Sequence, residues 1–253
     1  MPKYSHVELR TLQGRDTTED EIPVIDLSQV DNGLEERKHV AAKIRAAAEG
    51  TGFFYVKNHE IPEELIQRAL HQAQVFFAQS AEEKEKVLHS KFPKNDGYHG
   101  VGTTQTNNKE SHDQKETFSV RYNPFNDPTV SDRSPSPDHS QEGLWTGTSH
   151  PPGFKETTLE LYRARLSLAL DLEETYLDAV TTHPGADGLY VHYHGTSTNG
   201  AAASINVGIG SHTDIQCITL LWQDNSGGLQ VLSANGEWLD ARPIEGTLVV
   251  SIG

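Results

Sequence analysis

A histidine and a carboxylate stand two residues apart in His212-Thr213-Asp214. In an extended segment, residues i and i+2 point to the same side, so His212 and Asp214 could bind one metal ion while Thr213 faces away. An imidazole and a carboxylate are two thirds of the 2-His-1-carboxylate facial triad, which holds non-heme iron and leaves coordination positions open. We expect His212 and Asp214 to be metal ligands and catalytic residues.

The spacing alone is not diagnostic, because a chain with 13 His and 36 acidic residues will contain such a triplet by chance. A second one, His6-Val7-Glu8, lies in a polar stretch without strand character. His212-Thr213-Asp214 is instead followed by short β-rich runs separated by turn residues, and Asn235-Gly236 suits a tight hairpin turn. The predicted strands cover residues 218–222, 229–232, 237–239 and 247–252. The motif is therefore predicted to open an antiparallel β region.

Helices are predicted mainly before this region. Residues 35–49 carry Val40, Ile44 and Ala47 at helical spacing, and residues 63–79 follow Pro62 with an apolar face that ends in Phe76-Phe77. Ser80 is predicted to cap a short third helix. A longer amphipathic helix is predicted over residues 157–180.

Ordered motifs run through nearly the whole chain and carry a family resemblance. The N-terminal ones are Ile22 to Leu27, Gly52 to His59, Phe76-Phe77, Glu82-Glu83-Lys84 and Asp96-Gly97-Tyr98, and the C-terminal ones are Ser211 to Asp214, Thr219 to Asp224, Gly227 to Val231, Trp238 to Asp240 and Val249 to Gly253. Together they resemble the iron- and 2-oxoglutarate-dependent oxygenases of the isopenicillin N synthase-like group.

The resemblance implies a mixed α+β fold: a double-stranded β-helix core, jelly-roll or cupin-like, flanked by N-terminal and central helices. We expect one oxygenase domain over residues 1–253, made of a helical and strand region (1–122), an irregular loop (123–153), a long helix (154–183) and the first part of the β-helix core (187–253). The resemblance also implies Fe(II), O2 and 2-oxoglutarate as cosubstrate. The implied reaction is hydroxylation, desaturation or cyclisation of a small molecule, in specialised metabolism.

Two features depart from the family pattern. The family's distal histidine, and the arginine and serine that hold 2-oxoglutarate, lie downstream of the strand that ends at Gly253. We therefore expect the polypeptide to continue beyond Gly253, with further strands, a histidine and a basic residue. In addition, His192, His194 and Gly195 replace the Asn and Tyr-Pro pair that the family usually carries on this strand. Tyr193 and His194 are left as the cofactor-binding candidates.

Other residues are candidates for contacts with the substrate. Arg121 could pair with a substrate carboxylate, or with a neighbouring acidic residue. His99 could reach a substrate or be exposed to solvent, and His192 could act as a ligand or be a hydrogen-bonded strand histidine. The Pro- and Gly-rich segment 123–153 could be a lid over the active site or a disordered insertion.

Composition narrows the class of protein. A net charge of −15 without basic runs argues against nucleic acid or an anionic membrane as partner. One cysteine, Cys217, allows no internal disulfide and suits the reducing cytoplasm, and we expect it to be a buried apolar residue. No apolar stretch reaches the length of a membrane span. The sequence does not indicate the oligomeric state.

Three function classes fit these observations. The first is the 2-oxoglutarate-dependent oxygenase acting on a small molecule. The second is an iron oxidase of the same superfamily that uses O2 without 2-oxoglutarate. The third is a pseudo-oxygenase that binds a ligand without turnover. Release of CO2 from 2-oxoglutarate that depends on iron and substrate would single out the first.

Overall fold

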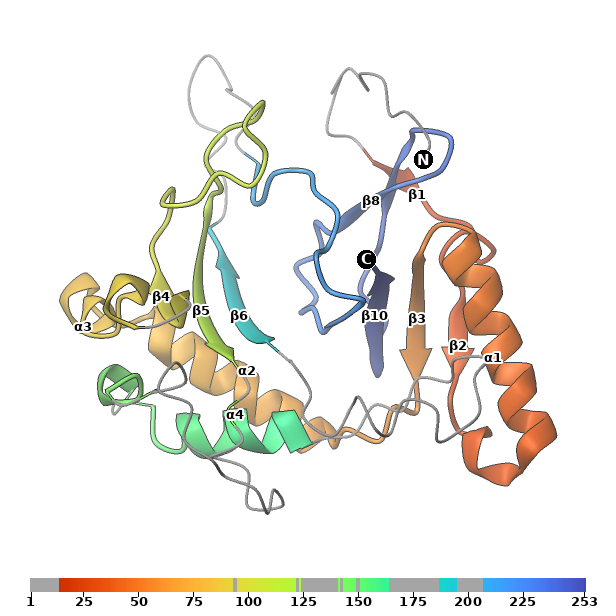
Figure 1. The fold of residues 1–253 in the computed structure, drawn as a ribbon, viewed down its shortest axis with the longest axis horizontal. Coiled ribbons are helices and arrows are strands. Elements are labelled where there is room, and N and C mark those ends of the chain that lie inside the picture. The colour runs from red at the N-terminus through yellow and green to blue at the C-terminus, as the bar shows by residue number, and fades with distance from the viewer. Residues whose placement is uncertain are drawn as a thin grey trace. The chain divides into compact units, whose positions relative to one another are not determined.

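The computed structural model describes residues 14–92, 95–121, 123, 141, 143–148, 151–163, 187–194 and 207–253. These residues fall into two compact units, which are described separately (Figure 1). The first unit contains the described residues up to Glu60 together with Thr213–Gly253. The second contains the described residues from Ile61 to His212. No described helix is both long enough and apolar enough to cross a membrane.

The first unit contains two sheets. One has the order β2 (Val24–Asp26), β3 (Phe53–Lys57), β10 (Thr247–Ile252) and β7 (Ile218–Leu221). The other has the order β1 (Arg15–Asp16), β9 (Trp238–Asp240) and β8 (Gln230–Leu232). Strand β10 pairs antiparallel with both of its neighbours, so that Val250 lies opposite Phe54 on one side and Leu220 on the other. The predicted antiparallel β region is thereby confirmed, with strand ends shifted by a residue or two.

Apolar side chains from both sheets form the core of this unit. Tyr55 and Val249 of the larger sheet cluster with Val231 and Leu239 of the smaller one. On β3, Phe54 and Val56 are fully buried and alternate with Tyr55, so they point to the opposite face of the sheet. Helix α1 (Leu34–Glu49) packs against β2 and β3 (Figure 1). Its buried residues are the predicted Val40, Ile44 and Ala47.

A tight turn joins β8 to β9 where Asn235-Gly236 predicts one. The backbone N–H of Gly236 donates to the carbonyl of Ser233 at 2.9 Å, and Ser233 N–H donates to Glu237 O at 2.8 Å. Gly236 has a φ of 81°, a conformation that glycine adopts at low cost. The glycine therefore fixes the register of Val231 opposite Leu239, which directs both side chains into the core.

The second unit contains a three-stranded antiparallel sheet with helices beside it. The sheet has the order β4 (Gly97–His99), β5 (Lys115–Arg121) and β6 (Asp187–Tyr193). Helices α2 (Glu63–Phe77) and α4 (Phe154–Arg163) pack against each other (Figure 1). Short elements complete the unit: α3 (Ala81–Glu85) and the 3-10 helices His89–Lys91 and Thr146–Thr148, while a third 3-10 helix, Val30–Asn32, belongs to the first unit.

Aromatic rings form the core of the second unit. The ring centroids of Phe76 and Phe118 are 4.9 Å apart in an edge-to-face arrangement, and Phe154 lies 5.3 Å from Phe118. All three are almost fully buried, and each such side chain contributes about 2 to 3 kcal/mol by burial alone. Leu144, which is 0% exposed, belongs to the same cluster. Leu144 of the segment 123–153 is thus packed into the core, whereas residues 124–140, 142 and 149–150 lie outside the described part.

Local sequence signals are confirmed at two helix starts, and a third start is decided by the structure. The Ser80 hydroxyl accepts the Glu83 backbone N–H at 3.3 Å and caps α3 as predicted. Helix α2 starts directly after Pro62. The long helix, predicted to start at residue 154 or 157, begins at Phe154, whose ring belongs to the aromatic core. Its predicted continuation over residues 164–180 lies outside the described residues.

Candidate active site

The segment that carries His212 and Asp214 is irregular rather than extended in a sheet. Residues 211–214 have no regular secondary structure, and β7 begins only at Ile218. The backbone N–H groups of Gly210 and Ser211 are bound by side-chain carboxylates instead of by a neighbouring strand. The motif thus precedes the strands of the antiparallel β region, as expected, but no strand pairing holds its backbone, and the metal assignment of both residues has to rest on their own contacts.

Asp113 is the anchor of the backbone just before His212. This carboxylate is 0% exposed. It accepts the backbone N–H of Gly210 at 3.1 Å and the hydroxyls of Thr106 and Thr104 at 2.6 and 3.0 Å. Burial alone would raise the pKa of Asp113, but these donors hold the pKa below its ordinary value. Asp113 is therefore a charged, fully hydrogen-bonded support for Gly210.

Glu110 and Asn107 hold the next residue, Ser211. Glu110 accepts the Ser211 backbone N–H at 2.9 Å and its hydroxyl at 2.6 Å, while the Asn107 side-chain amide donates to the same hydroxyl at 2.9 Å. Local sequence patterns did not reveal this support, because Glu110 and Ser211 are 101 residues apart. Their role depends on pairing that only the folded chain creates.

Two glycines in the run before His212 allow close approaches. A Cβ atom on Gly208 would lie 2.8 Å from the Tyr193 ring, and one on Gly210 would lie 2.7 Å from the backbone nitrogen of Asn107. Contacts this short require a shift of the neighbouring atoms. The glycines therefore let this segment lie tightly against β6 and against the loop around Asn107.

His212 is held in one tautomer. Its Nδ1 lies 2.8 Å from the carbonyl oxygen of Gly210. A carbonyl oxygen only accepts, so Nδ1 carries the proton and the Nε2 of a neutral ring carries the lone pair that a metal needs. A backbone carbonyl on the second ring nitrogen is the usual way in which proteins orient a metal-binding histidine. The contact fits a ligand role for His212.

The carboxylate of Asp214 is oriented by Ser251, a residue of the same unit. Ser251 of β10 donates its hydroxyl proton to Asp214 Oδ2 at 2.5 Å. The strand is central in its sheet and Ser251 is 7% exposed, so the hydroxyl is fixed in place. A carboxylate with one oxygen so held presents the second, Oδ1, in a defined direction. Asp214 thereby offers a carboxylate oxygen, one of the donor types that divalent iron takes.

A second group of potential ligands lies in the sheet of the other unit. Glu116 of β5 is 2% exposed, and its Oε1 lies 2.9 Å from His192 Nδ1 and 3.2 Å from His194 Nε2. Its Oε2 accepts from Lys84 Nζ and from the Tyr98 hydroxyl, each at 2.7 Å. His192 is thus a hydrogen-bonded strand histidine, one of the two alternatives that its position allows. Glu116 was not singled out by the sequence.

The remaining sequence candidates have structural partners. The Arg121 guanidinium lies 3.8 Å from carboxylates of both Asp96 and Asp187, which agrees with pairing to neighbouring acidic residues. His99 stacks on His89 at 4.0 Å and donates to Asn95 O at 3.0 Å. The His99 side chain is half-buried rather than exposed, and this burial lowers its pKa. Tyr193, 49% exposed, is the last residue of β6.

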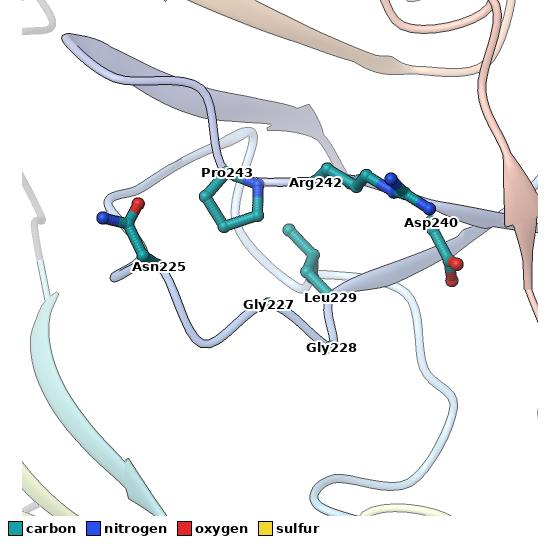
Figure 2. A pocket seen from close by; sticks show the side chains of 8 residues that line it. Asn225, Gly227, Gly228, Leu229, Asp240, Arg242 and Pro243 are labelled. Atoms are coloured by element: carbon teal, nitrogen blue, oxygen red, sulfur yellow. The ribbon is translucent and has the colours of Figure 1, made fainter.

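The first unit also carries an exposed cysteine and a surface hollow. Cys217 is a free and exposed thiol, which corrects the expectation of a buried apolar residue: the strand that would bury it starts one residue later. The hollow, of about 420 Å³, is lined by the turn at residues 225–229 and by the chain after β9 (Figure 2). In Figure 2 Leu229 projects between Gly227 and Pro243. Neither His212 nor Asp214 lines this hollow.

Comparison with known proteins shows the family to which the chain belongs. Residues 187–253 match the 2OG-Fe(II) oxygenase superfamily, and residues 22–141 match the N-terminal region of non-haem dioxygenases in morphine synthesis. A 2-oxoglutarate-Fe(II) type oxidoreductase of Metarhizium majus is 38% identical over 94% of this chain and 70% of its own length. The chain belongs to the 2OG-Fe(II) oxygenase superfamily.

Solved structures agree with the family. A full-length Neurospora crassa protein, solved in complex with alpha-KG, superimposes with a TM-score of 0.67, at 28% identity, over 94% of this chain and 75% of that protein. A second 2-oxoglutarate-Fe(II) type oxidoreductase, from Emericella nidulans, is 32% identical over 91% of this chain and 69% of its own length. The mixed α+β jelly-roll fold predicted from the sequence is therefore confirmed. As a 2OG-Fe(II) oxygenase, the protein is an enzyme of a class that uses Fe(II) and 2-oxoglutarate.

Proposed function

We propose that this 2OG-Fe(II) oxygenase oxidises a small-molecule substrate, with His212 and Asp214 as protein ligands of the iron. The observation that carries the proposal is the hydrogen bond from His212 Nδ1 to Gly210 O at 2.8 Å, which directs the lone pair to Nε2. The contact of Asp214 with Ser251 supports it, because one carboxylate oxygen is thereby oriented. Hydrogen bonds such as these two, which orient a side chain that binds a metal, raise the affinity for the metal.

The chain's own residues have defined tasks in this reaction. With iron and 2-oxoglutarate bound, O2 would be the oxidant, and oxidative decarboxylation of the 2-oxo acid would supply two of the four electrons that O2 takes up. Asp113 and Glu110 keep the backbone before His212 in place, so the imidazole need not reorganise when iron binds. The negative charge of Asp214 offsets part of the charge of the metal. Packing of Gly208 on Tyr193 leaves little room for water at that point.

A small-molecule substrate in specialised metabolism fits the relatives. Two of them are a Scopoletin 8-hydroxylase of Arabidopsis thaliana, 30% identical over 90% of this chain and 60% of its own length, and the Neurospora crassa protein, which has also been solved with thymine. The net charge of −15 favours neutral or cationic compounds over nucleic acid. The free thiol of Cys217 suits a reducing compartment such as the cytoplasm.

Release of CO2 from carboxyl-labelled 2-oxoglutarate tests the proposal. We expect the release to require Fe(II) and to rise when a panel of small aromatic and heterocyclic compounds contains the substrate, with product formation followed by mass spectrometry. Substrate oxidation without 2-oxoglutarate would instead identify an iron oxidase. Binding of 2-oxoglutarate without CO2 release from any compound would identify a pseudo-oxygenase. Either of these two results would overturn the proposal.

A further inference from the structure

Three potential metal ligands converge on one point of the second unit, apart from His212 and Asp214. Glu116, His192 and His194 each offer one ligand atom, and these atoms all lie within 4.8 Å of one another. Strand register brings them together. Glu116 of β5 is the direct partner of His192 of β6, and His194 lies two residues further on the same side. Unlike residues 211–214, Glu116 and His192 lie on paired strands, and His194 follows the last residue of β6.

The two separations from Glu116 Oε1 fit coordination of a single ion. Two ligand atoms about 2.1 Å from one metal lie about 3.0 Å apart at a right angle and about 3.4 Å apart at a tetrahedral angle. Glu116 Oε1 lies 2.9 Å from His192 Nδ1 and 3.2 Å from His194 Nε2. Both imidazole nitrogens thus approach the same carboxylate oxygen at the spacing of neighbouring ligands.

Burial and exposure also suit a metal site. Glu116 is 2% exposed and is fixed through its other oxygen by Lys84 and Tyr98, so Oε1 has a set direction. The side chains of His192 and His194 are 45% and 46% exposed, which gives an ion a path from solvent and room for bound water. The His192 ring also packs on Phe77, with centroids 5.5 Å apart, and this contact restricts its rotation.

We propose that Glu116, His192 and His194 form a second site for a divalent first-row transition metal, separate from the centre at His212 and Asp214. Two imidazoles and one carboxylate with open positions suit Zn²⁺, Co²⁺, Ni²⁺ or Fe²⁺. Metal replaces the proton that His192 Nδ1 otherwise donates to Glu116 Oε1. The ammonium of Lys84 is the charge that opposes metal binding, because it already pairs with Glu116 at 2.7 Å.

Titration with Co²⁺, followed by calorimetry and visible absorption, tests the site in the full-length protein carrying His212→Ala. This background lacks the first centre, and the titration has no turnover step, so its result is independent of the proposed oxygenase function. We expect Co²⁺ to bind with the absorption bands of mixed nitrogen and oxygen ligation. Adding His192→Ala and His194→Ala should weaken binding by more than about 100-fold, beyond what loss of a supporting residue costs.

Matched variants separate a metal site from a proton-bridged network. His71→Ala, an exposed change on α2, should leave Co²⁺ binding unaltered. Lys84→Met removes the opposing ammonium and should tighten Co²⁺ binding, with far-UV circular dichroism as the check on folding. No Co²⁺ binding by the His212→Ala protein, or binding that His192→Ala and His194→Ala leave unaltered, would overturn the proposal and leave the cluster as a hydrogen-bonded network.

Discussion

Ser251 of β10 donates its hydroxyl proton to Asp214 Oδ2 at 2.5 Å. This contact links a buried position of a central strand to one half of the His212-x-Asp214 motif, although Asp214 itself lies outside the strands. The sheet therefore orients the carboxylate indirectly, through a side chain.

Removal of the Ser251 hydroxyl should weaken iron binding more than it weakens the fold. For Ser251→Ala we expect a loss of iron affinity of about 10- to 100-fold, the range for residues that orient a ligand, and a loss of unfolding free energy of about 1 kcal/mol. Fe(II) titration and urea denaturation measure the two effects. Ser226→Ala, the same change in an exposed turn, is the control. Equal iron affinity in the two variants would show that Ser251 does not orient Asp214.

Loss of the Asp113 carboxylate should reduce both stability and iron affinity. Asp113→Ala leaves the buried N–H of Gly210 and the partly buried N–H of Thr106 without this acceptor, at a cost of about 2 kcal/mol in unfolding free energy. The backbone before His212 is then released, so Fe(II) affinity should fall as well. Asp31→Ala, an exposed change, should alter neither quantity. An unchanged urea midpoint in Asp113→Ala would contradict the anchoring role.

Glu116 and Lys84 should be strongly coupled in stability. They form an ion pair at 2.7 Å, with side chains 2% and 11% exposed. Glu116→Gln leaves the Lys84 ammonium uncompensated and should cost about 3 kcal/mol of unfolding free energy. The double variant Lys84→Met with Glu116→Gln should lose less than the sum of the single losses, which a double-mutant cycle in urea measures. Additive losses would mean that the pair does not act as a unit.

Acid should destabilise the fold through Glu116 and Asp113. Burial raises the pKa of each carboxyl, but the hydrogen bonds from Lys84 to Glu116 and from Thr106 to Asp113 outweigh it and hold both folded values below ordinary. The unfolded chain therefore binds these protons first, so stability present above about pH 4 is lost as the pH falls through the lower folded values. Urea midpoints between pH 6 and pH 3 should decline less steeply in Glu116→Gln. Parallel curves for the two proteins would contradict this.

The sequence predicted those features of the fold that depend on residues close together in the chain. The helical spacing of Val40 and Ile44 identified the buried side of α1, and Asn235-Gly236 identified the turn between β8 and β9, because backbone preference and apolar periodicity act over a few residues. The facing of Glu116 and His192 depends instead on the register of two strands 76 residues apart. The hydrogen bond from the Gly210 backbone to the Asp113 side chain likewise joins residues far apart in the chain, and it produces no periodic pattern in the sequence.

Iron binding and turnover by His212→Ala test the proposed metal centre most directly. The exposed change His71→Ala serves as the control, since it removes an imidazole of the same kind. We expect His212→Ala to lose iron-dependent CO2 release from 2-oxoglutarate while its urea midpoint stays close to that of the wild type, because the imidazole contacts the Gly210 carbonyl rather than the apolar core. Wild-type iron affinity and turnover in His212→Ala would contradict the assignment of the centre to His212 and Asp214.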